Sequence, residues 1–554
     1  MRYLLALIAV VFLATCSQQE TPSTPDIVTV NLTPAGGVLE AEWRLPEPVT
    51  EFIFYEDPMP YEQRLADWIP AGDGWKFNGG MLTREDGAAF DSFTLNLSPI
   101  KAVYDRKYVP VARAGDGGWI VFADALAPLG ASHQVSFEGF PEGTLIYGGG
   151  VVSGPHDIRD GQTLGIFYAG PAEYVHQDGG VLIAGPEIPE SMKTDISASL
   201  DEAIEKLTAA WGYAPETPPA VIITAEKDWN GQSWKGGVRE EVITFHIRGF
   251  DLDDGTGDFS AHIRNIALHE AIHVWNGTLF ESAENSEQSW VHEGGAEYIA
   301  NRLWMSDARF ASAVQAALNG CILNLGTASI RETEIASRGS TPYECGHIVH
   351  LAAELSALKQ HNGNVLDIWK AVYDAAGKER VYDSNTFVTA ATAAGGDVFG
   401  GIMSLFEAGL DSENVEALVA ELNSLGADIV LLDPAAASSG DTKLSFVLLR
   451  KLLNGYCQGA NGFTQMEDGF HFDTGDRCGD VLNGDPVVAT LNGHDLIASS
   501  TAAYFAAREA CEAGAPLVLT ALDGAALAPL ACPVQVAALP AIYEVRSAGM
   551  FPEL

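Results

Sequence analysis

Residues 269–276 are His-Glu-Ala-Ile-His-Val-Trp-Asn, an HExxH motif within a strongly apolar stretch. On a helix, His269 and His273 lie one above the other, so both imidazoles can bind one metal ion while Glu270 lies beside it. The alternative is a pair of histidines on a solvated helix face. The apolar neighbours favour a buried helix over residues 261–275, where histidines without a metal would be costly. The motif therefore predicts a metal site.

A second helical pattern, over residues 290–304, begins Trp-Val-His-Glu-Gly-Gly-Ala-Glu-Tyr and supplies the predicted third ligand. Glu293 offers a carboxylate, and two neutral histidines with one carboxylate form a zinc site that keeps an open position for catalysis. His292 stands next to it, so a site of three histidines is an alternative. Glu297, one helical turn further, is either a partner for the N–H group of a ligand histidine or a side chain on a solvated face.

Together the two stretches resemble the gluzincin zinc metallopeptidases, which combine HExxH with a glutamate in a W-x-x-E-G-x-A helix. Trp275 and Asn276 make the chain most similar to the glycyl aminopeptidase (M61) family, which is related to the M1 aminopeptidases. Two features depart from these families. The 19 residues between His273 and Glu293 are one more than in M1 enzymes, and the basic run of typical M61 members is absent. The resemblance implies bound Zn²⁺ and a thermolysin-like, mainly α catalytic domain with a small β-sheet.

A third motif, residues 341–346 (TPYECG), is similar to the PYEKG segment of M1 enzymes. The resemblance implies that the hydroxyl of Tyr343 stabilises the tetrahedral intermediate. The alternative is an ordinary aromatic residue at a helix start. Cys345 replaces the lysine of the family, and a disulfide to Cys321 would explain the exchange by pinning the helix.

The three motifs predict a zinc-dependent metallopeptidase that hydrolyses peptide bonds in a peptide or protein substrate. Zn²⁺ would be bound by His269, His273 and Glu293. Glu270 would take a proton from the attacking water, and Tyr343 would donate to the developing oxyanion. Two alternatives are a catalytically inactive, peptide-binding surface lipoprotein and hydrolysis of a substrate other than a peptide.

The strand pattern upstream of the HExxH motif bears on exopeptidase action. M1 and M61 enzymes hold the substrate amine with a glycine-containing strand that carries a glutamate, and residues 236–241 (GGVREE) stand at the corresponding place. The glycines match, but Arg239 occupies the position of the glutamate. Glu240 can substitute only after a shift of one residue, so the sequence leaves aminopeptidase and endopeptidase action open.

The hydrophobic patterns predict a multidomain chain with three domains. Short alternating runs separated by glycine, proline and aspartate turns predict an all-β, sandwich-like domain over residues 27–175. Helical spacing predicts the catalytic domain over residues 187–430. Residues 435–554 combine strand and helix patterns and predict an α+β module. This module is similar to a degenerate PDZ domain around residues 479–481, and an ordinary small α+β domain is the alternative.

The N-terminus predicts export to the bacterial cell envelope. Residues 1–16 combine Arg2, a short apolar core and the sequence Leu-Ala-Thr-Cys, which resembles the signal peptide and lipid-modified cysteine of lipoproteins. An ordinary secretory signal is the alternative. Residues 17–26 form a polar tether rich in proline, serine and threonine. We therefore expect an outer-membrane or periplasmic lipoprotein whose membrane contact is the lipid on Cys16.

The charge of the chain restricts its partners. The 554 residues include 74 acidic and 31 basic side chains, which gives a formal net charge of -43. Because so large an excess of acid repels polyanions, nucleic acid and anionic membrane surfaces are unfavourable partners.

The remaining six cysteines predict disulfides, as in other exported proteins. Six cysteines allow about 15 connectivities. Here they form three close pairs with separations of 24, 21 and 21 residues. This spacing favours sequential pairing: 321 with 345, 457 with 478, and 511 with 532.

Overall fold

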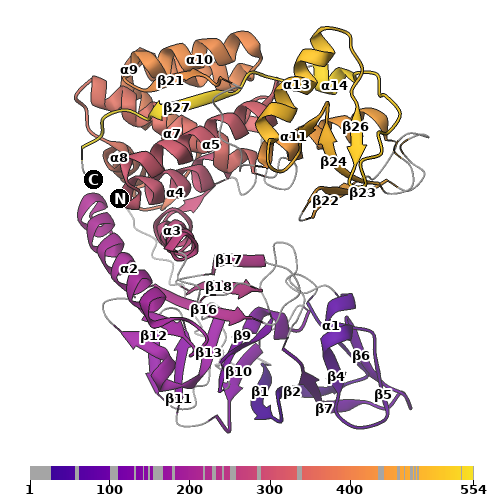
Figure 1. Cartoon of the computed structure of the whole chain (residues 1–554). Helices are drawn as coiled ribbons and strands as arrows, with labels where there is room; N and C mark the ends of the chain where they lie inside the picture. Colours follow the sequence, from indigo (N-terminus) through magenta and orange to yellow (C-terminus); the bar gives the residue numbers. More distant parts are fainter. Residues whose placement is uncertain are drawn as a thin grey trace, which may run out of the picture. The chain divides into compact units, whose positions relative to one another are not determined.

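The computed structural model in Figure 1 describes most of residues 27–554. The predicted signal peptide (1–16) and tether (17–26) lie outside the described residues. After residue 27, the segments outside the description are 56–60, 100–109, 116, 130–132, 141–142, 148–149, 154–165, 178–180, 216–218, 228–232, 240–241, 250–251, 253–256, 284–288, 333–339, 434–441, 458–461, 467, 475–477, 479–481, 483–485, 538 and 553.

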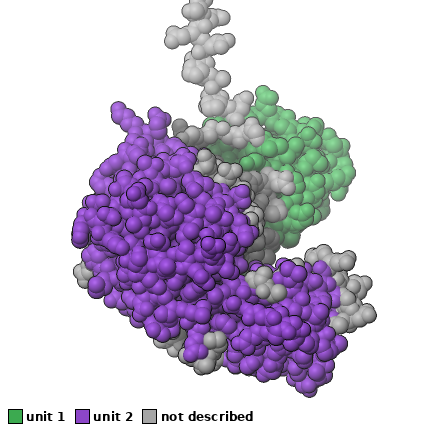
Figure 2. Space-filling view, turned by 90° about the horizontal axis from the view of Figure 1, so that it is seen from above, with its two compact units in different colours: residues 1–176, 182–188, 222–250 green, residues 177–181, 189–221, 251–554 purple. Residues whose placement is uncertain are grey.

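The chain divides into two compact units, which Figure 2 shows in green and purple. This division by packing differs from the predicted domains, whose boundaries stay predictions. The first unit contains residues 1–176, 182–188 and 222–250, and the second contains residues 177–181, 189–221 and 251–554.

Strands dominate the first unit. Its described elements, a few of whose end residues are counted in the second unit, are β1 (Val28–Ala35), β2 (Val38–Val49), β3 (Glu51–Ile53), α1 (Tyr61–Asp67), β4 (Trp68–Pro70), β5 (Trp75–Phe77), β6 (Met81–Arg84), β7 (Phe90–Leu97), β8 (Val111–Ala114), β9 (Gly118–Phe122), η1 (Ala123–Leu126), β10 (His133–Phe137), β11 (Gly143–Tyr147), β12 (Gly150–Ser153), β13 (Ile166–Pro171), η2 (Ala172–Tyr174), β14 (Val175–Gln177), β15 (Val181–Ala184), β16 (Ala220–Glu226), β17 (Ser233–Arg239) and β18 (Val242–Arg248). They form sheets in the orders β10-β1-β2-β7-β4, β12-β11-β13-β9-β8, β14-β15-β16-β18-β17 and β3-β6-β5.

The β1–β2 hairpin shows why the N-terminal residues form a sheet. Along β1, Val30 and Leu32 are fully buried, whereas the alternating residues Thr29 and Asn31 are half-buried. This period of two places one face of the strand on the core. Gly36 and Gly37 connect the strands with φ values of 58° and 97°, which residues with side chains rarely adopt. The predicted N-terminal β domain is confirmed.

The second unit is mainly helical up to residue 431. Its elements there are α2 (Glu190–Trp211), α3 (Gly257–His273), η3 (Val274–Leu279), β19 (Glu281–Ser282), α4 (Ser289–Trp304), α5 (Asp307–Leu325), η4 (Ile330–Glu332), α7 (Thr341–Lys359), α8 (Val365–Ala376), β20 (Val381–Tyr382), α9 (Ser384–Ala408), α10 (Ser412–Ser424) and β21 (Asp428–Leu431). The predicted helical domain is therefore confirmed. Over the described part of the chain, we find no helix with the length and apolar character needed to cross a membrane.

Helix α7 lies at the centre of this helical region. It packs against α4, α5 and α9, and every residue from Cys345 to Ala357 is buried. A helix that is buried on all sides is not amphipathic, and apolar residues occupy most of this stretch of α7. The buried polar side chains in this stretch are His347, His350, Glu354 and Ser356. Any group fixed to α7 is thus held on three sides by other helices.

The buried position of α7 gives His350 a role in acid stability. Burial lowers the pKa of His350 to about 3, so the folded chain holds this imidazole neutral, whereas an unfolded chain protonates it below a pKa of about 6.5. Stability from this group is present above pH 6.5 and is lost as the pH falls toward 3. When the pH is lowered from 7 to 5, the unfolding free energy of both proteins should fall. We expect this fall to be about 2 kcal/mol smaller for His350→Gln than for the wild type, because the variant lacks this imidazole. Thermal melts at both pH values check this, and equal losses in the two proteins would contradict it.

A smaller α+β region follows the helices, from α11 to α14. Its elements are α11 (Lys443–Tyr456), β22 (Gly462–Gln465), β23 (Phe470–Asp473), β24 (Val487–Leu491), β25 (His494–Asp495), α13 (Ser500–Glu512), β26 (Leu519–Ala521) and α14 (Val534–Ala537). The strands form a sheet in the order β22-β23-β24-β25, and β26 also pairs with β24.

The last strand leaves this region and returns to the helices. β27 (Tyr543–Ser547), drawn in yellow in Figure 1, pairs antiparallel with β21 beside α10. The side chain of Asn319 in α5 binds both main-chain polar groups of Tyr543, at 2.8 and 2.9 Å. Tyr543 and Val545 are buried in the helical core. The chain end therefore packs with the helices, although sequence patterns alone assign it to the C-terminal module.

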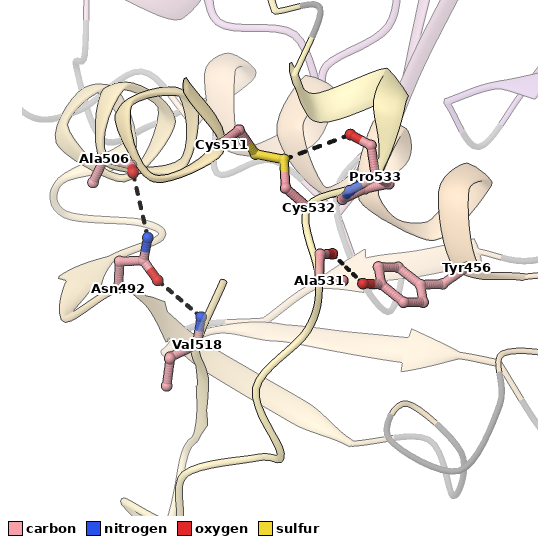
Figure 3. Close-up of a disulfide and its surroundings, with 8 residues drawn as sticks. All are labelled: Tyr456, Asn492, Ala506, Cys511, Val518, Ala531, Cys532 and Pro533. Carbon is pink, nitrogen blue, oxygen red and sulfur yellow. Dashed lines mark hydrogen bonds between the residues drawn. A yellow bond between two sulfur atoms is a disulfide. The ribbon is translucent and has the colours of Figure 1, made fainter. Parts of the chain in front are cut away.

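The predicted sequential disulfides are all confirmed: Cys321–Cys345, Cys457–Cys478 and Cys511–Cys532. Figure 3 shows the third of them, which joins α13 to the segment before α14. Near it the Tyr456 hydroxyl donates to the main-chain oxygen of Ala531. The bonds therefore connect helices to neighbouring segments in both parts of the second unit.

Candidate active site

Helix α3 carries the HExxH motif at its C-terminal end. The helix continues directly into η3, a π-helical turn, and such turns are frequent at functional sites. In this turn, Oδ1 of Asn276 lies 2.8 Å from Nδ1 of His273. The imidazoles of His269 and His273 belong to residues that are only 6% and 4% exposed. The motif is thus part of a buried helix rather than of a solvated helix face.

His269, His273 and Glu293 converge on one point. The Nε2 atoms of the two histidines are 3.1 Å apart, and each lies 3.2 Å from Oε2 of Glu293. Glu293 comes from the first turns of α4, which packs against α3. Within the described ranges, this is the one group of three metal-ligating side chains whose ligand atoms lie close enough to share an ion.

The spacing of these three atoms fits a small divalent metal ion. Ligand atoms about 2.0–2.2 Å from a tetrahedral zinc lie about 3.4 Å from one another, which is close to the 3.1–3.2 Å found here. Imidazole nitrogen and carboxylate oxygen are also donor types that zinc accepts. The three side chains therefore form a site that can hold a metal.

The opposite ring nitrogens of both histidines have partners of their own. Nδ1 of His269 lies 3.2 Å from Oε2 of Glu297, and Asn301 donates to the other carboxylate oxygen at 3.2 Å. Nδ1 of His273 faces Asn276. A protonated Nδ1 held in this way turns the lone pair of Nε2 toward the shared point, as ligation requires. Of the two predictions for Glu297, the contact with a ligand histidine matches the structure.

The charges of the carboxylates differ in a way that suits different tasks. Burial opposes ionisation of Glu293, but His273 and the hydrogen bonds of both histidines hold its pKa well below the usual range. Burial also opposes ionisation of Glu297, and His269 nevertheless lowers its pKa to about 2. By contrast, burial raises the pKa of Glu270. Glu293 and Glu297 are therefore suited to hold cations, and Glu270 is a stronger base than an ordinary glutamate.

His292 lies behind this group rather than in it. Its Nδ1 atom is 2.9 Å from the main-chain oxygen of Asn276 and 3.1 Å from the hydroxyl of Tyr382. Its ring stacks on that of His273 with centroids 4.2 Å apart. In return, the side-chain amide of Asn276 donates to the main-chain oxygen of His292 at 3.0 Å. This geometry supports His273 from behind and favours Glu293 over His292 as the third ligand.

Tyr343, in the first turn of α7, faces the same point. Its ring stacks on His269 with centroids 5.9 Å apart and an interplanar angle of 27°. Burial and the charges of Glu293 and Glu270 raise its pKa, so the hydroxyl stays protonated and can donate a hydrogen bond. The five predicted site residues therefore lie together in the structure: His269, Glu270, His273, Glu293 and Tyr343.

Two glycines set the distance between α4 and α7. A side-chain carbon on Gly294 would lie 2.3 Å from the Cα atom of Gly346, and one on Gly346 would lie 2.0 Å from the main-chain oxygen of Trp290. The helices can cross so closely only because both positions lack a side chain. Since Glu293 precedes one glycine and Tyr343 is one turn before the other, this crossing fixes the ligand relative to the tyrosine.

We expect Gly346→Ala to destabilise the protein by about 3 kcal/mol or more, because the added methyl group overlaps main-chain atoms that cannot move independently. The control is Gly401→Ala in α9, where nothing lies within 4 Å of the added carbon; it should be neutral or slightly stabilising. Thermal melts compare the two variants. Equal melting temperatures would show that the crossing has room for a side chain.

Sequence reasoning missed several residues that support this site. Tyr382 donates to the main-chain oxygen of Asn276 at 2.7 Å, and Asn265 donates to Asn301 at 2.8 Å. Tyr382 is 106 residues from its partner, so no local pattern indicates the contact. Asn265 precedes His269 by four residues, and this helical spacing was an available signal.

Comparison of the sequence with protein-family models finds no match, and comparison with curated proteins finds none either. Comparison of structures does find likenesses. The chain is similar to an aminopeptidase N family protein from Idiomarina loihiensis, with a TM-score of 0.53 and 12% identity, over 94% of this chain and 98% of that one. The two proteins share a fold.

Other solved structures are less similar. Native leukotriene A4 hydrolase from Saccharomyces cerevisiae has a TM-score of 0.34 and 14% identity, over 67% of this chain and 64% of that one. The yeast hydrolase in complex with bestatin has a TM-score of 0.39 and 12% identity, over 78% of this chain and 77% of that one. A shared fold is therefore stated only for the Idiomarina loihiensis protein, whose TM-score of 0.53 exceeds those of the yeast structures.

Proposed function

We propose that the chain is a zinc-dependent metallopeptidase that hydrolyses peptide bonds. The observation that carries this proposal is the convergence of His269, His273 and Glu293 on one point, with Glu270 and Tyr343 beside it. The fold shared with an aminopeptidase N family protein adds support. The same likeness leads us to propose aminopeptidase action on a peptide or protein substrate.

Each site residue has a task in this proposal. Bound zinc would supply a Lewis acid and lower the pKa of a water molecule. Glu270 lies next to the ligands without being one, so it can take the proton of the attacking water and pass it to the leaving amine. Tyr343 can donate to the carbonyl oxygen as negative charge develops there. Glu297 and Asn276 hold the two imidazoles in the ligand orientation.

Tyr343→Phe should lower kcat by about 10²–10³ with little change in KM, because it removes one donor that acts mainly in the transition state. The ring and its stacking on His269 remain. Steady-state kinetics on a cleaved peptide measure both constants. A rise in KM at constant kcat would instead assign Tyr343 to substrate binding.

The amine anchor and the cellular location are also proposals. Residues 236–239 lie in β17, the edge strand of its sheet, whereas Glu240 falls outside the described residues.

We propose export with a lipid on Cys16 as the membrane contact, which three disulfides support because they are typical of oxidising compartments. The likeness to M61 enzymes and the PDZ-like character of the C-terminal module stay part of this proposal.

The direct test is removal and return of the metal. The purified chain should contain one zinc per molecule by elemental analysis, lose peptidase activity after chelation and regain it with zinc. Products cut one residue from the N-terminus would support aminopeptidase action, and internal cuts would indicate an endopeptidase. Full activity in the metal-free chain would refute the proposal.

A further inference from the structure

The first turn of α7 carries Tyr343, and the two residues that follow the tyrosine, Glu344 and Cys345, are both bonded to α5. Cys345 forms a disulfide with Cys321, and their Cα atoms are 4.7 Å apart. Asn324 donates to Oε2 of Glu344 at 2.9 Å. The two contacts involve adjacent residues of α7 and one face of α5, where positions three apart are neighbours.

A close approach of the helices accompanies these contacts. A side-chain carbon on Gly320 would lie 2.3 Å from the carboxyl carbon of Glu344, so the glycine leaves the space that the glutamate fills. Cys321 and Cys345 are themselves fully buried. By contrast, Ser340 before the helix makes no side-chain capping hydrogen bond. The start of α7 is therefore attached to α5 through residues that immediately follow Tyr343.

The other side of the same turn rests on α4. Gly346 contacts Gly294 and the main chain of Trp290. The polar contacts between α4 and α7 lie further along α7, where Glu354 accepts hydrogen bonds from Tyr298 and Arg302. Near Tyr343 the contact between the two helices is close packing, which permits small sliding movements. A covalent bond between α5 and α7 does not permit such sliding at its own position. The glycine crossing thus sets the separation of the helices, and the disulfide sets the position of the turn along the crossing.

We propose that the Cys321–Cys345 disulfide is a positioning element for the Tyr343 hydroxyl, and this inference rests on the proposed function. A donor to an oxyanion is effective only near 2.7–3.1 Å from the oxygen, and a displacement of about 1 Å can cost about 10²-fold in rate. Cys345 follows the tyrosine by two residues and begins a run of buried residues that continues to Ala357. It acts on the reaction through Tyr343 and touches no reacting atom.

A merely stabilising disulfide would behave differently. Its loss would lower the melting temperature and leave kcat of the folded enzyme unchanged, or change kcat independently of Tyr343. A positioning disulfide loses its effect once the hydroxyl is gone, so the two substitutions are not additive. This difference defines the experiment.

The experiment is a double-mutant cycle in the full chain loaded with zinc. Cys321→Ser with Cys345→Ser is combined with Tyr343→Phe, and kcat and KM are measured for each protein on a peptide that the wild type cleaves. We expect loss of the disulfide to lower kcat by about 10–100-fold at constant KM and constant zinc content. In the Tyr343→Phe background it should lower kcat by less than about twofold.

A matched control and a second readout accompany the cycle. Cys511→Ser with Cys532→Ser removes a disulfide of similar span in the C-terminal region and should leave kcat unchanged. A phosphinic analogue of the cleaved peptide, titrated by calorimetry, should bind 10–100-fold more weakly when the 321–345 bond is absent. If the serine pair does not fold, Cys321→Ala with Cys345→Val keeps the apolar volume and takes its place.

Three outcomes would overturn the inference. One is an unchanged kcat without the disulfide, and another is an equal fall in kcat with tyrosine and with phenylalanine. Both leave the proposed function intact. The third is a wild-type chain that carries zinc and cleaves no peptide, which refutes the proposed function and this inference together.

Discussion

Glu270→Gln is expected to retain zinc and fold while losing about 10²–10⁴-fold in kcat. Glutamine has nearly the same shape as glutamate, but it cannot accept the proton of the attacking water. Glu270 is not among the three converging ligands, so the metal should stay bound. The pKa of Glu270 is raised because burial opposes ionisation more strongly than the neighbouring His269 and His273 favour it. Elemental analysis and steady-state kinetics measure the two effects.

The matched control for this variant is Glu281→Gln, which makes the same exchange at an exposed residue of β19. It should keep both zinc and full turnover. If Glu270→Gln instead loses its zinc, the glutamate acts as a ligand and the assignment of the general base is wrong. If it keeps full turnover, another group removes the proton.

Glu293→Gln is expected to remove most of the bound zinc, whereas His292→Ala should keep it. The Glu293 oxygen is 3.2 Å from both ligand nitrogens, and its carboxylate supplies the negative charge of the ligand set. His292 uses Nδ1 for the main chain of Asn276, and its replacement leaves the main-chain oxygen that binds the Asn276 side chain. Zinc per chain after dialysis distinguishes the two variants.

The opposite pattern of zinc retention would support the site of three histidines. Thermal melts without metal serve as the control for folding. His292→Ala should lower the melting temperature, because it removes a stacked ring and a buried hydrogen bond. Loss of zinc from this variant only above its melting temperature agrees with a supporting role.

The metal-binding residues could be predicted because their geometry is local. Two histidines four residues apart face one way on any helix, and Glu293 opens the next helix in an apolar context that predicts burial. The strands of the N-terminal region are likewise visible as alternating residues such as Val30 and Leu32. In both cases the spacing along the chain sets which side chains share a face.

The supporting contacts could not be predicted because they join distant residues. Tyr382 reaches the turn after His273 from a short strand, and Asn319 captures the main chain of Tyr543 from 224 residues away. Such contacts depend on the angles at which helices cross, and the spacing of residues within one helix does not determine these angles. The role of Gly346 is intermediate, since its motif is visible in the sequence whereas the atoms it meets on α4 are not.

The most direct test of the central claim is to incubate the zinc-loaded chain with a mixed peptide library and identify new termini by mass spectrometry. Wild type, chelated wild type and Glu270→Gln are compared at equal concentration. We predict new peptide termini with the zinc-loaded wild type and almost none with the other two. Equal inertness of all three, together with similar peptide affinity of wild type and Glu270→Gln, would contradict the hydrolase account and identify a peptide-binding protein instead.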